Sequence, residues 1–366
     1  MEQNELKNIV SHFAIRGTVS DIKPLGAGLI NDTLLVTTAE ADAPNYVLQR
    51  VNTNVFPDVD LVMRNIYAVT THIRKKLEAA GETEIDRKVL TFMPAKDDDT
   101  KLYAIVDGQY WRMMIFIENA VTKQAVNPES SRAAGKAFGQ FQAMLADIPV
   151  ELGETIKDFH NMEFRLQQLR EVIAKDPVGR VAEPEVQAML KEIDARAEYM
   201  CQAERMGREG VLPKRVCHCD TKVNNMMFDA SGEVLCVIDL DTVMPSFVFS
   251  DFGDFLRTAA NKVAEDDPRI EMVEFDMEIF KAFAKGYIES ASVFLTPVER
   301  ENLPYAAALF PYMQAVRFFA DYINGDTYYK IKYDDHNLVR TRNQMALFRS
   351  VMANMSAMQE FISYSA

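Results

Sequence analysis

The chain has 366 residues, which is enough for one large domain or two smaller ones with a substantial core. Its 48% hydrophobic and 26% charged residues are ordinary for a globular protein. The formal net charge of −14 argues against a nucleic-acid ligand, because such ligands bind cationic surfaces.

Targeting and redox signals are also missing from the sequence. The stretch MEQNELKNIV has no apolar signal core, and no apolar run reaches the roughly 18 to 20 residues that span a bilayer. The four cysteines show no disulfide-like spacing. Cys217 and Cys219 flank His218, but a structural zinc site takes about four ligands and no second cluster is evident. We therefore expect a cytoplasmic, reduced protein without a membrane or nucleic-acid partner, and we infer no protein partner.

The first elements are a short helix and a glycine-containing hairpin. Residues 2–14 have the apolar spacing of an amphipathic helix, and residues 22–36 predict two strands with a glycine turn between them. Gly26 and Gly28 in the turn would let backbone amides approach a phosphate closely. A hairpin needs such glycines in any case, so they do not by themselves indicate a nucleotide.

More strands and one helix complete a small N-terminal region. A strand over residues 46–50 precedes a helix over 58–80, with Asp58 as N-cap and Gly81 as stop. Three further strand-like runs lie at residues 89–94, 102–106 and 110–116. Together these elements predict about five antiparallel strands and one helix.

The remainder of the chain has mostly helical periodicity. The expected helices lie at residues 128–147, 159–173, 184–206 and 312–322. We therefore predict an α+β, two-lobed fold. Residues 1–118 would form a small antiparallel β lobe, and residues 119–366 a larger, mostly helical lobe.

The most informative stretch is KRVCHCDTKVNNMMFDASGEVLCVIDLD, residues 214–241. It predicts two antiparallel strands, 226–229 and 234–238, joined by a tight turn. Pairing Asp229 with Glu233 would place Asn225 opposite Val237.

This register would bring three polar side chains together at the open end of the hairpin. Asn225 precedes the first strand, Asp239 follows the second, and Asp220 lies five residues before Asn225. Mg²⁺ takes oxygen ligands and keeps several positions for water and phosphate, so Asn225 and Asp239 suffice as protein ligands. Asp220 is then available to orient an acceptor hydroxyl and receive its proton. The set, with the spacing His-x-Asp-x4-Asn, favours metal-assisted phosphoryl transfer over a solvated loop.

These residues resemble the catalytic segment of the aminoglycoside and choline kinase families. The resemblance implies a protein-kinase-like fold, in which the small lobe, residues 1–118, binds the nucleotide and the helical lobe, residues 119–366, provides catalysis and substrate binding. The chain is more similar still to bacterial N-acetylhexosamine 1-kinases, and this similarity extends over most of it. The shared motifs are Asn-Asp-Thr after the glycine turn, Leu-Gln-Arg, Asp-Thr-Lys after His-Cys, Ile-Asp-Leu-Asp-Thr-Val-Met-Pro and Asp-Phe-Gly-Asp at 251–254.

The resemblance implies roles for the residues of this segment. Asp220 matches the catalytic base, and Asn225 and Asp239 match the metal ligands. Asp251 matches a structural aspartate that braces the catalytic loop, and we expect His218 to be structural as well. Asp241 is a weaker candidate for contact with metal or substrate.

The resemblance also implies ATP and Mg²⁺ as cofactors. Phosphate would be held by the glycine turn and a strand-end cation, and adenine by the backbone of a hinge. The residues in these roles are Gly26, Gly28, Arg50, Glu118 and Asn119. The sequence departs from protein kinases in having no lysine at the Arg50 position, and a one-residue shift would put Gln49 there. No glutamate precedes Glu78 on the following helix, so the acidic partner of Arg50 stays unassigned.

The substrate comes from the resemblance alone. It implies that the anomeric C1 hydroxyl of N-acetylglucosamine or N-acetylgalactosamine is phosphorylated, with Asp220, Arg317 and Asp32 facing the sugar. Arg317 and Asp321 are four residues apart on one helix, so they also have the spacing to pair with each other. The alternatives are a kinase of another alcohol, of aminoglycoside, choline or homoserine type, and a non-catalytic nucleotide-binding protein. The preferred sugar, ATP versus GTP, the oligomeric state and the pathway stay open.

Overall fold

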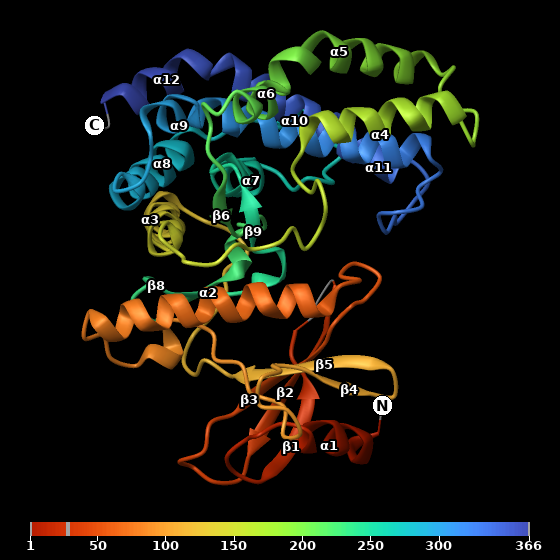
Figure 1. The fold of residues 1–366 in the computed structure, drawn as a ribbon. Helices are drawn as coiled ribbons and strands as arrows, with labels where there is room; N and C mark the ends of the chain where they lie inside the picture. The colour runs from red at the N-terminus through yellow and green to blue at the C-terminus, as the bar shows by residue number, and fades with distance from the viewer. Residues whose placement is uncertain (1, 27–29, 365–366) are drawn as a thin grey trace. The chain divides into compact units, whose positions relative to one another are not determined.

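A computed structural model describes residues 2–26 and 30–364 (Figure 1). They fall into two compact units, each built from separate stretches of chain. The first unit lies within Met1–Thr122, Asp147–Lys157 and Met226–Met244, and the second within Lys123–Ala146, Asp158–Asn225 and Pro245–Ala366. The division of the chain into lobes at residue 118 stays a prediction.

The described residues of the first unit form a five-stranded antiparallel sheet in the order β1-β2-β3-β5-β4. Its strands are β1 (Val19–Pro24), β2 (Asp32–Thr38), β3 (Tyr46–Arg50), β4 (Ala104–Val106) and β5 (Gln109–Ile115). Helix α1 (Gln3–Ser11) buries Leu6, Ile9 and Val10 in one apolar core with strand residues such as Val36 and Leu48. Burial of this apolar surface is what ties the helix to the sheet.

One predicted strand of this region does not form. Residues 89–94 make only an isolated bridge between Phe92 and Met114. Two segments share the edge of β5 that this strand would occupy. Strand β4 pairs with residues 109–111 of β5. Further along β5, residues 91 and 93 form backbone hydrogen bonds with residues 115 and 113. Because two short segments divide one edge, neither extends along all of it.

Helix α2 (Val59–Ala79) connects the separate stretches of the first unit. It begins as predicted, with the Asp58 carboxylate accepting a 2.9 Å hydrogen bond from the Leu61 amide. The buried Asn65 carboxamide donates to the carbonyls of Gly153 (2.8 Å) and Val243 (2.9 Å). One side chain therefore holds segments from all three stretches.

The predicted hairpin at residues 226–238 is present as β7 (Met226–Phe228) and β8 (Val234–Val237). The expected register is wrong by one residue, because a bulge between Met227 and Phe228 sets Met226, not Asn225, opposite Val237. Asn225 still directly precedes β7, and Asp239 follows β8 by two residues.

The second unit is mainly helical. Its helices are α3 (Pro128–Leu145), α4 (Met162–Lys175), α5 (Pro184–Met200), α6 (Gln202–Arg208), α7 (Phe249–Ala259), α8 (Met277–Ala291), α9 (Pro297–Glu301), α10 (Leu303–Ile323), α11 (His336–Ala353) and α12 (Met355–Tyr364). Two short strands, β6 (Arg215–Cys217) and β9 (Met244–Ser246), are also present, the latter lying across the boundary between the units. The helix predicted over 184–206 is divided at Cys201 into α5 and α6.

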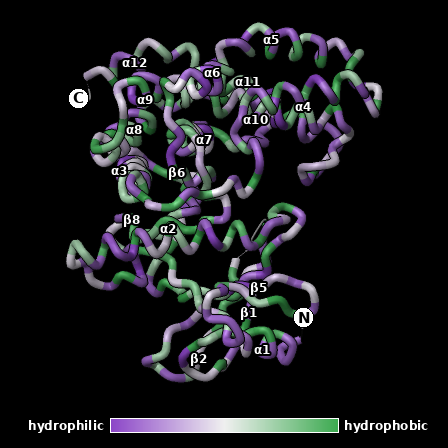
Figure 2. Tube along the Cα trace, in the orientation of Figure 1, coloured by the Kyte–Doolittle hydropathy of each residue, from purple (hydrophilic) through white to green (hydrophobic). Residues whose placement is uncertain are grey.

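Helix α10 forms the centre of this unit, with buried residues on every side, whereas α4 and α5 alternate polar and apolar residues (Figure 2). The predicted α+β, kinase-like fold, with a small antiparallel sheet followed by a larger helical part, is confirmed. Within residues 2–26 and 30–364, no helix has both the length and the apolar character to cross a membrane.

Glycines bring α3 and α8 unusually close together. A Cβ atom on Gly135 would lie 2.1 Å from the Phe283 carbonyl oxygen, and one on Gly286 would lie 2.1 Å from that of Arg132. These distances leave no room for a side chain, so the two backbones are in direct contact.

Candidate active site

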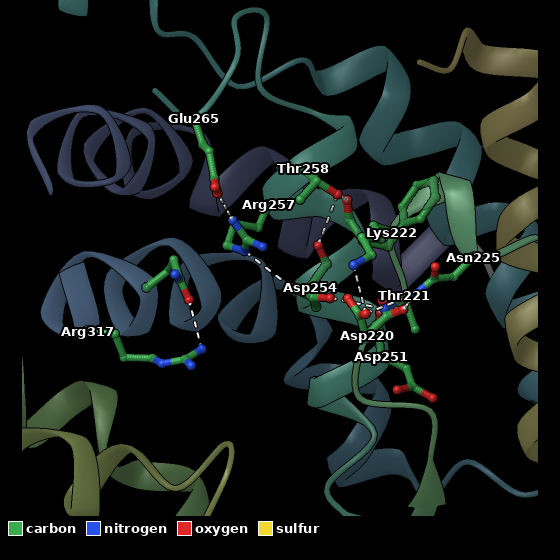
Figure 3. Close-up of polar contacts among 12 residues, drawn as sticks. Asp220, Thr221, Lys222, Asn225, Asp251, Asp254, Arg257, Thr258, Glu265 and Arg317 are labelled. Carbon is green, nitrogen blue, oxygen red and sulfur yellow. Dashed lines mark hydrogen bonds and ion pairs between the residues drawn. The ribbon is translucent and has the colours of Figure 1, made fainter. Parts of the chain in front are cut away.

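The loop from residue 218 to 225, which we call the Asp220 loop, is held by two carboxylates from α7 (Figure 3). Asp251 accepts hydrogen bonds from the amides of His218 (3.0 Å) and Cys219 (2.8 Å). Asp254, one turn further along, accepts from the amide of Thr221 (3.0 Å). Cys219 has the uncommon left-handed φ of 63°, so these bonds fix a strained turn.

Asp251 is itself braced from the opposite side. The Gln142 carboxamide of α3 donates to Asp251 at 2.8 Å and accepts from the Tyr287 hydroxyl of α8. Complete burial raises the pKa of Asp251 to about 6, although His218 and the two backbone amides oppose this change. His218 is buried against Phe138 and accepts a 3.2 Å hydrogen bond from the Asp220 amide. Both side chains are thus buried contacts of the Asp220 loop, and their structural roles stay predictions.

The Asp220 carboxylate is held but accessible, with 25% of its side chain exposed. Lys222 Nζ lies 2.9 Å from Asp220 Oδ2, and Asn225 Nδ2 donates to the same oxygen at 3.0 Å. Asn225 also donates to the Asp220 carbonyl at 2.8 Å. Because the Asn225 nitrogen is turned to Asp220, its carboxamide oxygen is the atom left to act as a hard ligand.

Asp254 belongs to a further charged network that the sequence analysis missed. Arg257 donates to Asp254 at 3.2 Å and to Glu265 at 2.7 Å. Burial raises the pKa of Asp254 and the charge of Asp220 adds to this, while Arg257 and Lys222 oppose it. Arg257 therefore stabilises the ionised Asp254 that accepts from the Thr221 amide.

In the first unit, Asp239 lies two residues after the end of β8 and has a left-handed φ of 60°. Asp241, two residues on, is fully buried and forms a two-pronged ion pair with Arg112 of β5. The Asn31 carboxamide donates to Asp241 at 2.8 Å and accepts from the Asn52 amide at 3.0 Å. The chain after Asp239 is thus attached to the sheet.

Arg50 and Gln49 of β3, the two candidates for the position of the kinase lysine, have different partners. Arg50 pairs with Asp32, the residue opposite it on β2, and both side chains are exposed. Gln49 instead accepts a 3.0 Å hydrogen bond from the buried Arg112. The acidic partner that the sequence left unassigned is therefore Asp32 on a strand, not a glutamate on α2.

Three of the residues predicted to contact the nucleotide, Gly26, Glu118 and Asn119, lie in bends or turns. Gly26 has a φ of 69° and open space around its Cβ position, whereas Gly28 lies outside the described residues. Glu118 and Asn119 form an exposed turn after β5, where the Glu118 carbonyl accepts a 3.3 Å hydrogen bond from Arg87. Their roles in nucleotide binding stay predictions.

Arg317 does not pair with Asp321, although the spacing allows it. Its guanidinium donates to the Gln314 carboxamide at 3.0 Å and lies over the Phe159 ring. Asp321 accepts instead from the amides of residues 327, 328 and 329 and from Asn337. Four donors fix this carboxylate in a turn, so Arg317 is left for other contacts.

Arg112, Asp254 and Asn31 are the main site neighbours that sequence reasoning missed. Arg112 stands within the apolar run YWRMMIF, and a charge in such a run signals a buried partner. In the described part of the chain, no group of three or more His, Cys, Asp or Glu side chains is arranged to hold a metal ion. The two predicted metal ligands, Asn225 and Asp239, are one asparagine and one aspartate, so they would not form such a group.

Several solved structures share the fold. An aminoglycoside phosphotransferase from Alicyclobacillus acidocaldarius is 12% identical with a TM-score of 0.64, and the match covers 98% of this chain and 96% of that one. An amicoumacin kinase in complex with AMP-PNP, Ca²⁺ and its antibiotic is 14% identical over 94% and 93% of the chains, with a TM-score of 0.59. A spectinomycin phosphotransferase in complex with ADP and spectinomycin is 14% identical over 98% and 99%, with a TM-score of 0.55.

Residues 21–287 match the family described as "Phosphotransferase enzyme family". This range is more than half of the chain and contains the Asp220 loop, both α7 carboxylates and the β7–β8 hairpin. The chain belongs to the phosphotransferase enzyme family.

Proposed function

We propose that this phosphotransferase is an ATP-dependent, Mg²⁺-dependent kinase that phosphorylates the anomeric C1 hydroxyl of N-acetylglucosamine or N-acetylgalactosamine. The observation that carries the kinase part is the Asp220 carboxylate, which is held by Lys222 and Asn225 and is still partly exposed. The sugar comes from the motif resemblance to N-acetylhexosamine 1-kinases.

In this mechanism Asp220 orients the acceptor hydroxyl and takes its proton. The sugar oxygen forms a bond to the γ-phosphorus of ATP as the bond to the bridging β–γ oxygen breaks, and ADP leaves. Lys222, next to Asp220, neutralises charge on the transferring phosphoryl group. Asp251 and Asp254 hold the backbone of the loop, so that Asp220 keeps its position throughout the reaction.

Asn225 and Asp239 would hold the metal ion. Both supply oxygen donors, which Mg²⁺ prefers, and the orientation of the Asn225 amide leaves its oxygen for this role. In this place a bound Mg²⁺ would neutralise charge on the phosphates. Asp239 follows β8 in a left-handed conformation, and the Arg112–Asp241 ion pair restrains the chain just beyond it.

The remaining roles concern nucleotide and sugar. Gly26 and Gly28 would approach phosphate through their amides, and the backbone at Glu118 and Asn119 would bind adenine. Arg50 would reach phosphate by leaving Asp32. That pair is exposed, and exposed pairs contribute only about 0–1 kcal/mol, so the exchange has a small cost. Asp32 and Arg317 would then contact sugar hydroxyls.

The test is ADP release, dependent on ATP and Mg²⁺, across an acceptor panel. The panel holds N-acetylglucosamine, N-acetylgalactosamine, glucose, galactose, choline, homoserine and kanamycin, with Asp220→Ala as the control. Turnover of the acetylated sugars to an acid-labile C1 phosphate supports the proposal in full. Turnover of amines alone would replace the substrate and keep the kinase. ATP binding without turnover of any acceptor would favour a non-catalytic nucleotide-binding protein, and unchanged turnover by Asp220→Ala would remove Asp220 as base.

A further inference from the structure

Five polar side chains of the first unit form a closed ring of hydrogen bonds, which we call the polar ring. The Asn31 carboxamide donates to Asp241 at 2.8 Å, and Arg112 forms its two-pronged ion pair with the same carboxylate. Arg112 also donates to the Gln49 oxygen at 3.0 Å, and the Gln49 nitrogen donates to the Thr33 hydroxyl at 3.1 Å. The ring closes where the Thr33 hydroxyl donates to the Asn31 carbonyl at 3.4 Å. Each member therefore has a defined partner on both sides.

The part of the polar ring around Asp241 is shielded from water. The side chains of Arg112 and Asp241 are each 2% exposed, and Asn31 is 7% exposed. Water does not compete for these hydrogen bonds, and breaking one would leave a buried polar group without a partner. A buried network in which the members satisfy one another holds a single arrangement. The ring is therefore a stiff connection between the sheet and the segment after β8.

The polar ring joins the two places of the first unit where phosphate and metal would bind. Asn31 follows the glycine turn, and its carboxamide oxygen accepts a 3.0 Å hydrogen bond from the Asn52 amide. The Asn52 side chain donates to the Ile30 carbonyl at 3.2 Å, so the chain after the turn is held twice. Asp241, on the other side of the ring, is two residues after Asp239. The Asn31 side chain thus connects the end of the turn to the segment that carries Asp239.

The bond from Asn31 adds a restraint that the charge of Asp241 does not require. Arg112 already bonds to both oxygens of this carboxylate and neutralises it. Asn31 fixes the same carboxylate from a different place, directly before the first residue of β2. A displacement of the turn would therefore move Asp241, and a displacement of Asp241 would move the turn, because the two are in direct contact.

We propose that Asn31 is a positioning residue that couples the binding of Mg²⁺ to the binding of the nucleotide phosphates. A nucleotide that contacts the glycine turn would set the segment carrying Asp239, and a metal ion on Asp239 would set the turn. Such coupling is reciprocal, and it adds to the direct attraction between Mg²⁺ and phosphate. The inference rests on the proposed function, since it uses the predicted phosphate role of the turn and the predicted metal role of Asp239. It does not depend on the acceptor.

The experiment measures ADP binding to the full chain by calorimetry, once with excess Mg²⁺ and once with EDTA. The ratio of the two Kd values is the Mg²⁺ enhancement, which we expect to be at least about tenfold in the wild type. Asn31→Ala removes the link to Asp241 and should lower the enhancement by at least about fivefold, with a change of less than about twofold in the Kd with EDTA. An unchanged enhancement would overturn the inference. So would an equal loss of affinity in both conditions, which is the result expected of a purely structural role.

The matched control is Asn52→Ala, a second asparagine to alanine change beside the turn. It removes the bond to Ile30 but keeps the Asn52 amide and the Asn31–Asp241 bond, so the enhancement should stay at the wild-type value. An equal fall of the enhancement in both variants would overturn the specific role of Asn31. If Asn31→Ala does not fold, Asn31→Leu, which fills the volume of the carboxamide, is measured against the same outcomes.

Turnover in the acceptor panel is a separate readout. Kinase activity of the wild type, together with an unchanged enhancement in Asn31→Ala, would remove this inference and leave the proposed function intact. A wild-type protein that binds ADP equally well with and without Mg²⁺ would overturn the inference and also the metal role of Asp239.

Discussion

Arg112 of β5 and Asp241 of the segment after β8 form an ion pair in which each side chain is only 2% exposed. The pair joins residues that are far apart in sequence, and it restrains the chain at Asp241, two residues after Asp239. In the described sheet, Arg112 also donates a 3.0 Å hydrogen bond to Gln49 of β3. The buried guanidinium therefore contacts both the neighbouring strand and the segment after β8.

The first prediction concerns the stability of this pair. Arg112→Met or Asp241→Leu alone should lower the free energy of unfolding by about 3–5 kcal/mol, because each leaves an uncompensated buried charge. Combining both substitutions should recover much of the loss. Urea denaturation of the three variants measures this coupling, and strictly additive effects would contradict it.

The second prediction concerns Asp254. Asp254→Ala should lower kcat by roughly 10- to 100-fold with little change in the KM for ATP, because the loop holding Asp220 loses its Thr221 anchor. Asp254→Asn keeps an oxygen acceptor for that amide and should retain more activity. Steady-state kinetics of both variants provides the measurement. A change confined to KM would mean that Asp254 acts on binding and not on the position of Asp220.

The third prediction follows from Glu204 of α6. This carboxyl accepts a 2.7 Å hydrogen bond from the Met162 amide, and burial raises its pKa to about 7. A raised pKa means that the folded protein holds a proton which the unfolded chain releases above its ordinary pKa of 4.5. Stability should therefore fall as the pH rises from about 4.5 to 7, by up to about 3 kcal/mol, and level off above.

Glu204→Gln removes this titration and keeps an oxygen for the Met162 amide. The variant should match the wild type near pH 4.5 and be more stable at pH 8. Thermal or urea unfolding at several pH values gives the comparison. If the difference between the two proteins is the same at every pH, the raised pKa is wrong.

The fourth prediction uses the contact between α3 and α8. Glycine to alanine in a helix normally stabilises by about 0.5–1 kcal/mol, but Gly135→Ala and Gly286→Ala should each destabilise by about 1–3 kcal/mol or more. The reason is the 2.1 Å approach that a new Cβ would make to a backbone oxygen. The exposed Lys136→Ala on the same helix should change stability by less than about 0.5 kcal/mol. A stabilised Gly135→Ala protein would disprove the close contact.

Local signals in the sequence were sufficient for much of the fold. The Asp58 cap, the strand at residues 46–50 and the hairpin around residue 230 depend on neighbours in the chain, and all three formed where expected. The hairpin register was wrong because a bulge depends on how side chains pack, which alternation alone does not reveal.

The failures at the site have a different cause. The Asp32–Arg50 pair depends on strand register, and Arg112–Asp241 depends on a contact between distant segments. The spacing of Arg317 and Asp321 allowed an ion pair, but the Asp321 carboxylate accepts hydrogen bonds from three backbone amides of the following turn instead. Sequence spacing indicated which residues carry chemistry, but not which of several possible partners each one has.

The division of the first unit into three stretches has a consequence for synthesis on the ribosome. Residues 1–122 emerge first, but the partners of Asn65 and Arg112 lie at residues 153, 241 and 243. Until residue 243 has left the exit tunnel, the nascent sheet carries a buried arginine without its carboxylate and an unsatisfied carboxamide. We therefore expect a nascent chain stopped before residue 241 to be less stable than the completed unit, and so more dependent on chaperones and more readily cleaved by proteases.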